Sequence, residues 1–175
     1  MKKIVILLIS LLLMSCTNTS NVPSKKVEEF FSKYQNMDSS VLTQLEAVVN
    51  NDYFMNDEEK AQYIALMKRQ YQNLSYKIDS EEVTNTGVIV KTTIEVYDYA
   101  KSVRESEKYY LDHPEEFSSD INSTLYLDYK IKNMVNTNDK IKYNIDFYLR
   151  KDNNTWELSG IGDIDLEKIH GLYDA

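Results

Sequence analysis

The 175-residue chain has few of the residues that cross-link or ligate. It contains one cysteine, two histidines, four glycines and two prolines. A single cysteine excludes an intrachain disulfide, so the hydrophobic core alone must hold the fold. A transition-metal site needs several His or Cys ligands, and His113 and His170 lie far apart in sequence. We therefore expect no metal, and we find no internal repeat.

A long apolar run is also lacking. The longest stretch, from Ile4 to Met14, is broken only by Ser10, whereas a bilayer-spanning helix takes about 20 apolar residues. Lys2 and Lys3 precede it, and a small residue and a cysteine follow it. This order of charge, short apolar core and small residue is typical of a secretory signal.

Leu13-Met14-Ser15-Cys16 resembles the lipobox of bacterial lipoproteins. In that family the thiol receives a diacylglycerol, and cleavage then makes the cysteine the first residue; Met14 is larger than the residue usual at its position. The alternative is a plain signal peptide with a stray thiol. We expect a signal peptide over residues 1–15, lipidated Cys16 with a polar tether over 16–23, and one domain over 24–175. Two or more acyl chains hold a protein stably at a membrane, so the expected location is its extracytoplasmic face.

The sequence lacks an excess of positive charge. Lys and Arg number 20 against 28 Asp and Glu, and loss of Lys2 and Lys3 with the signal leaves 18 against 28, a net charge of −10. A nucleic-acid binder carries a basic face, so we expect no nucleic-acid partner. An acidic body prefers cationic or neutral partners, although the charge also serves solubility alone. Abundant Asn, Lys, Ile and Tyr suggest a low-GC Gram-positive host; a Gram-negative host stays open.

Helical periodicity opens the domain. A helix begins at Pro23-Ser24, Asp38 can cap a second, and Asn56 with Glu59 makes the capping-box pattern of a third. His113-Pro114 ends a later helix. The later helices are expected over residues 99–111, 120–135 and about 165–172. The apolar stripe of the 120–135 helix is broad.

Alternation with a period of two marks the strands. Apolar residues alternate over 74–78 and 88–96, with a turn near residues 85–87 between them. The strongest strand is DKIKYNIDFYLRK at 139–151, which a polar turn joins to a strand containing Trp156. Two hairpins predict a curved antiparallel sheet of about four strands packed against the N-terminal helices. The fold class is α+β.

Three segments carry a resemblance: PSKKVEEFFSKY, VKTTIEVYDYAKSV and IKYNIDFYLRKDNNTWEL. Together they resemble the nuclear-transport-factor-2-like (NTF2-like, cystatin-like superfamily) domain of small Gram-positive lipoproteins. The resemblance implies a sheet wrapped around the leading helix and a conical cavity that some members use for ligands. Two helices between the hairpins depart from the pattern and would alter the cavity mouth. The outward strand residues are charged, so we expect a monomer rather than a dimer through the sheet.

No catalytic constellation is visible. The G-x-S-x-G nucleophile motif is absent. Enzymes of the resembled superfamily use a buried Asp base, but strand parity places Asp79 and Asp146 outward. Helical acids such as Asp128 remain an alternative. The acidic stretch from Asp163 to Glu167 has Lys168 where a calcium loop needs glycine, and it fits a helix start instead.

Fourteen tyrosines allow a binding role, and the candidate cavity-lining residues are Phe30, Tyr34, Tyr143 and Trp156. The alternative is that they fill the core and its rim. We expect a non-enzymatic, membrane-anchored binding module for a small ligand or an envelope protein, without a cofactor. An enzyme with a helix-borne pocket carboxylate and a structural or immunity-type lipoprotein stay open.

The Cys16→Ser substitution tests the anchor. Without the thiol no acyl chain attaches, so the protein should move from the membrane pellet to the soluble fraction on fractionation of the producing cells. Undiminished pelleting of the Cys16→Ser protein would contradict lipid anchoring.

Overall fold

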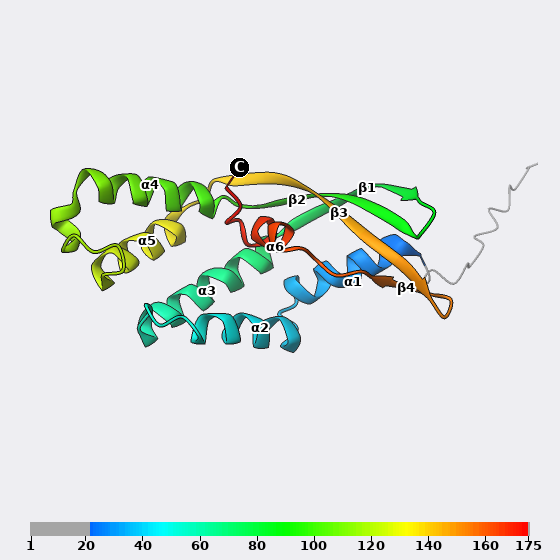
Figure 1. Cartoon of the computed structure of the whole chain (residues 1–175), viewed down its shortest axis with the longest axis horizontal. Helices are drawn as coiled ribbons and strands as arrows, with labels where there is room; N and C mark the ends of the chain where they lie inside the picture. The colour runs from blue at the N-terminus through cyan, green and yellow to red at the C-terminus, as the bar shows by residue number, and fades with distance from the viewer. Residues whose placement is uncertain (1–21, 175) are drawn as a thin grey trace, which may run out of the picture.

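A computed structural model describes residues 22–174 of the protein (Figure 1). The segment over 1–15, Cys16 and most of the expected tether lie outside the described residues. The elements follow one another as α1 (Pro23–Gln35), α2 (Ser39–Asn50), α3 (Asp57–Asn73), β1 (Ser75–Val83), β2 (Val88–Tyr97), α4 (Tyr99–Asp112), the 3₁₀ helix η2 (Pro114–Phe117), α5 (Thr124–Asn136), β3 (Lys140–Asp152), β4 (Thr155–Leu158) and α6 (Asp163–His170).

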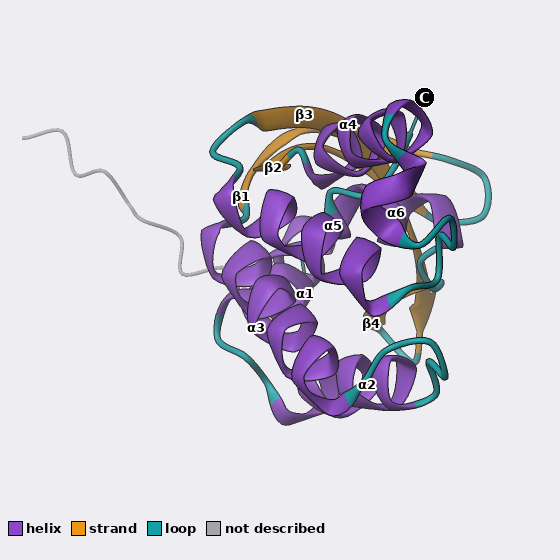
Figure 2. Cartoon of the chain, turned by 90° about the vertical axis from the view of Figure 1, so that its left-hand side faces the viewer, coloured by secondary structure: helices purple, strands orange, loops and turns teal. Residues whose placement is uncertain are grey.

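The expected α+β class is confirmed. The four strands form one antiparallel sheet in the order β1-β2-β3-β4. The sheet covers one side of the molecule, and α1, α3 and α6 pack beneath it (Figure 2). The alternation predicted for β2 and β3 is also confirmed, because their inward residues are buried or, at Ile141 and Tyr143, half-buried, while Asp146 on β3 is exposed. Asp79 on β1 lies at an irregularity of the β1–β2 register and is exposed.

Side-chain caps start the helices near the predicted places. Asp38 accepts a hydrogen bond from the Ser40 amide at 2.9 Å, and Asn56 with Glu59 forms the reciprocal capping box of α3. The helix expected to start at residue 120 starts instead at Thr124. Its N-cap is Ser123, whose hydroxyl accepts from the Tyr126 amide.

The late start of α5 has a local cause. After the left-handed Ser118 and Ser119, residues 120–123 form a turn. The Asp120 carboxylate accepts from the Asn122 amide at 2.9 Å, and the Asp120 carbonyl accepts from the Ser123 amide at 3.0 Å. The last helix likewise ends at His170 rather than at residue 172, since Gly171 terminates it with φ 71°.

One core joins the sheet to the helices. Phe31 on α1 is fully buried and meets the Phe147 ring of β3 edge to face, with centroids 5.4 Å apart. Removing such a ring costs about 3–5 kcal/mol. Every buried residue of this core cluster lies between Val27 and Ile169, so residues before α1 supply none of it. The body over residues 17–175 therefore carries its whole described core.

A buried amide joins α3 to the end of the sheet. Gln70 is fully buried, and its side-chain NH₂ donates to the Tyr97 carbonyl at 3.0 Å while its oxygen accepts from the Tyr97 amide at 2.9 Å. Gly171 packs against this joint, where a Cβ would lie 2.1 Å from the Tyr97 oxygen. The end of β2 is thereby fixed against α3.

Two pairs of helices project from one end of the molecule. The pair α2–α3 and the pair α4–α5 both point to the left in Figure 1, away from the end at which α1 begins beside β4. Within residues 22–174, no helix has the length and apolar character needed to cross a membrane. The space between these two pairs is where the candidate site lies.

Candidate functional site: the groove between α3 and α5

A groove with a volume of about 810 Å³ separates α3 from α5. We call it the α3–α5 groove. Both helices begin at the projecting end and run toward the sheet (Figures 1 and 2). Two helices supply all of its lining residues: Gln62, Ala65, Leu66 and Arg69 from α3, and Asp128, Tyr129, Lys132 and Val135 from α5.

The floor of the groove is apolar because α5 has two apolar faces. One face is buried against the rest of the protein and consists of Tyr126, Leu127, Ile131 and Met134. The other faces the groove and carries Tyr129 and Val135, of which Val135 is 45% exposed. A helix with one buried stripe usually carries polar residues on its open side, so these two apolar residues stand out. The second face therefore marks the groove as a surface suited to an apolar partner.

Two charged residues of the groove are unpaired. Asp128 and Lys132 stand one helical turn apart on α5, both exposed, and neither has a hydrogen bond or ion pair with any residue of the described chain. The carboxylate lies nearer the projecting end and the ammonium nearer the sheet. Asp128 was the helical acid expected as an alternative pocket base. It lies in the groove, but on a wall that is exposed to solvent.

Arg69 closes the inner end of the groove. Its guanidinium donates to the Val135 carbonyl at 2.5 Å and to the Thr137 carbonyl at 2.9 Å. Its Cζ also lies 4.1 Å from the centre of the Tyr97 ring, a cation–π contact. The planar fork of arginine satisfies carbonyls at the end of α5 that no longer have helical partners. Arg69 therefore links α3 to the end of α5.

Aromatic rings hold the outer end. Tyr129 stacks on Tyr109 of α4 with centroids 5.1 Å apart and meets Phe117 of η2 at 5.3 Å. The Tyr109 hydroxyl donates to the Glu116 carboxylate at 3.1 Å, and this hydrogen bond raises the pKa of Tyr109. The groove-lining ring is thus held from behind by α4 and η2.

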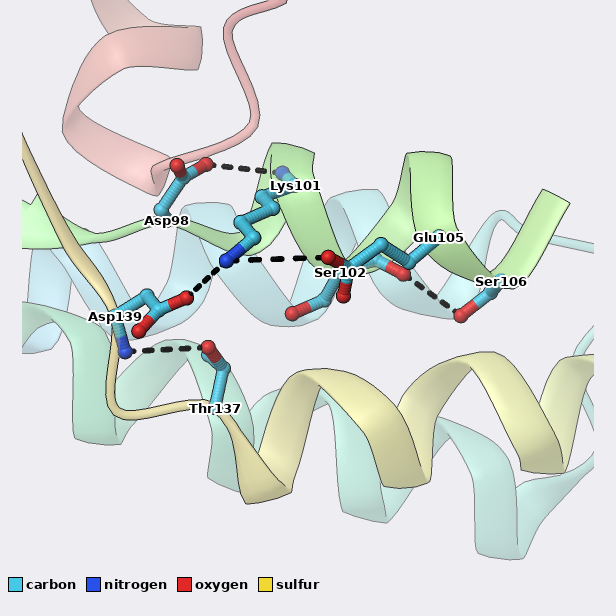
Figure 3. Close-up of polar contacts among 7 residues, drawn as sticks. All are labelled: Asp98, Lys101, Ser102, Glu105, Ser106, Thr137 and Asp139. Carbon is cyan, nitrogen blue, oxygen red and sulfur yellow. Dashed lines mark hydrogen bonds and ion pairs between the residues drawn. The ribbon is translucent and has the colours of Figure 1, made fainter. Parts of the chain in front are cut away.

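A polar network fixes α4 and α5 where they leave the sheet (Figure 3). Asp98 caps α4 by accepting from the Lys101 amide at 2.9 Å, and the Lys101 ammonium pairs with Asp139 just before β3. The hydrogen bond to Asp139 raises the pKa of Lys101. Deeper between the helices, Asn133 donates to the Ser106 hydroxyl at 2.9 Å. The network supports the groove without lining it.

The four residues expected to line a cavity come from three elements, α1, β3 and β4. Phe30 and Tyr34 are neighbours on α1, with ring centroids 5.0 Å apart. Tyr143 instead donates its hydroxyl to the Tyr173 carbonyl at 2.9 Å, and Trp156 packs on the rim of the core under Lys151. None of the four lines the α3–α5 groove.

Tyr34 does line a second, smaller hollow of about 160 Å³. It lies between α1, α2, α3 and α6, and its walls include Tyr63, Tyr71 and His170. Burial raises the pKa of Tyr63 to about 12 and lowers the pKa of His170 to about 4. Sites for drug-sized ligands occupy about 300–1,000 Å³, so this hollow is below that range while the groove is within it.

The other histidine, His113, ends a helix, as expected. His113 is the C-cap of α4, and it lies with Glu115 and Glu116 so that one ligand atom from each falls within 4.8 Å of the others. Among residues 22–174 this is the one group of three metal-ligating side chains that comes together. It is on the surface, and Glu116 already accepts from Tyr109.

No protein-family model, no curated protein and no solved structure matches the chain. Its site must therefore be interpreted from its own residues.

The low pKa of His170 predicts acid sensitivity. The His170 side chain binds a proton near pH 6.5 in the unfolded chain but only near pH 4 in the folded chain. Its contribution to the free energy of unfolding is therefore fully present above pH 6.5 and is lost as the pH falls toward 4. Between about pH 7 and pH 4.5 this group should remove about 2 kcal/mol of the free energy of unfolding. Urea titrations of the wild type and of His170→Gln should differ in this pH dependence. The control His113→Gln should behave as the wild type does; an unchanged profile for His170→Gln would contradict the assignment.

Proposed function

We propose that the protein is a lipid-anchored binding module at the extracytoplasmic face of the membrane. Its α3–α5 groove binds the apolar surface of a ligand. One observation carries the binding role: an open groove with an apolar floor and two unpaired charges of opposite sign. Exposed apolar residues that gather in a groove rimmed by polar groups are typical of interaction sites.

The anchor and the groove are compatible in space. The lipobox-like segment ends at Cys16, a few residues before α1 begins, and α1 begins at the end of the molecule opposite the projecting helices (Figure 1). A chain tethered through Cys16 would present the groove away from the membrane. The acidic body, with a net charge of −8 over the whole sequence, is also repelled by anionic lipid headgroups.

We further propose that the domain is of the NTF2-like type. In support, α1 is the leading helix and packs against β1, β2 and β4 of the antiparallel sheet. The two helices α4 and α5 between the hairpins are the departure from that pattern noted in the sequence. The proposed binding site belongs to this departure, since α5 forms one whole wall of the groove.

We also propose that the protein binds its ligand without catalysing a reaction. A pocket base needs a carboxylate shielded from water, and Asp128 is exposed. Glu59 is fully buried, but it does not line the groove, and one of its oxygens accepts from the Asn56 amide in the capping box. A purely structural lipoprotein would need no open groove. Binding without turnover is the function that these residues support best.

Dye binding tests the groove. The probe 1-anilinonaphthalene-8-sulfonate should bind residues 17–175 with increased fluorescence, and Ala65→Glu should weaken its binding at least fivefold by placing a charge on the groove floor. Ala61→Glu is the matched control, since Ala61 is also exposed on α3 but does not line the groove. An equal effect of both substitutions, or of neither, would count against the groove as a binding site.

A further inference from the structure

We propose that the occupant of the α3–α5 groove is an amphipathic helix of a partner protein, running antiparallel to α3 and α5. This inference rests on the proposed binding function and names its partner. The groove walls, the length of the apolar face on α5 and the distribution of charge along the groove each favour such a helix.

The walls of the groove fit a helix better than a small molecule. Sites for small ligands enclose about 70–90% of the ligand surface, which requires walls on several sides. Here all the lining residues belong to two helices, so the groove is open along its length. A third helix packs into such a space at the usual interaxial distance of about 8–10 Å, with its apolar residues entering the groove.

The length of the apolar face sets the length of the occupant. The α5 residues that line the groove run from Asp128 to Val135, about two turns, or about 10 Å at a rise of about 1.5 Å per residue. Opposite them, Ala65 on α3 is small enough to let a helix backbone approach closely. A partner segment of about two to three turns, with apolar residues at i, i+3 or i+4 and i+7, would cover this face.

Charge along the groove gives the occupant a direction. The outer end is acidic, with Asp128 inside the groove and Asp57 and Glu58 at the start of α3. The inner end carries Arg69 and the unpaired Lys132. Helices commonly place acidic side chains in the first turn and basic ones in the last. Such a helix pairs its charges with the groove only when its N-terminus lies at the inner end, antiparallel to α3 and α5.

Display selection tests the inference without knowledge of the natural partner. A library of 15-residue helical peptides, with apolar residues fixed at heptad spacing and the other positions random, is selected against residues 17–175. We expect enriched peptides with acidic residues first and basic residues last, whose binding is lost in Ala65→Glu and kept in Ala61→Glu. Synthetic versions with the charge order reversed should bind about fivefold more weakly, because each exposed ion pair contributes modestly.

A charge swap in the protein supplies the decisive comparison. In the double variant Asp128→Lys/Lys132→Asp the preference between the two peptide orders should invert. Equal affinity for both orders in both proteins would overturn the proposed direction, and selected peptides that are insensitive to Ala65→Glu would overturn the site.

Three further outcomes separate this inference from the binding function. If the dye binds in the groove but no helical peptide is enriched, the occupant is a small molecule and the helix proposal fails alone. If residues 17–175 dimerise and Ala65→Glu abolishes the dimer, the occupant is a second copy of this chain. If neither dye nor peptide depends on the groove, both proposals fail.

Discussion

Two successive side chains of α3 hold the separate parts of the molecule together. Gln70 pairs with both backbone groups of Tyr97 at the end of β2, and Arg69 binds the Val135 and Thr137 carbonyls at the end of α5 while covering the Tyr97 ring. The chain has no second cysteine with which to fix this junction covalently. The position of α5 relative to α3, and hence the width of the groove, therefore depends on hydrogen bonds to backbone carbonyls.

The core below this junction is shared by the whole fold. It draws on the sheet and on every helix from α1 to α6, and the contact between Phe31 and Phe147 joins α1 to β3 within it. The α4–α5 pair is held by the buried face of α5, by polar contacts at its base and by the rings of Tyr109, Phe117 and Tyr129 at its far end. The groove-facing side of α5 can keep apolar residues exposed because the opposite side of the helix is already buried against the rest of the protein.

The sequence was sufficient to predict most of the helices and strands, but it predicted few features of the candidate site. Periodicity and caps located the helices and strands, because those signals are local. The start of α5 was misplaced because the Asp120 side chain binds the Asn122 amide and forms a turn where a helix start was expected. Of the expected cavity residues, Tyr34 lines a small hollow and none lines the α3–α5 groove. Two features of the sequence could have indicated more of the site. The broad stripe of the 120–135 helix indicates a second apolar face, and Gln70 is a polar residue on the apolar side of α3, three residues after Met67. The partners of Arg69 are carbonyls, which no sequence pattern displays.

The central claim is that Arg69 holds the α3–α5 groove at a defined width. Spin labels at Gln62→Cys and Asp128→Cys, in a Cys16→Ser background, report the distance across the groove by pulsed electron paramagnetic resonance. With Arg69 present we predict one narrow distance distribution, and with Arg69→Ala a broader distribution shifted to longer distances. Lys68→Ala, a neighbouring change at a residue with no polar partner in the described chain, should leave the distribution narrow. An unchanged distribution in Arg69→Ala would contradict the claim.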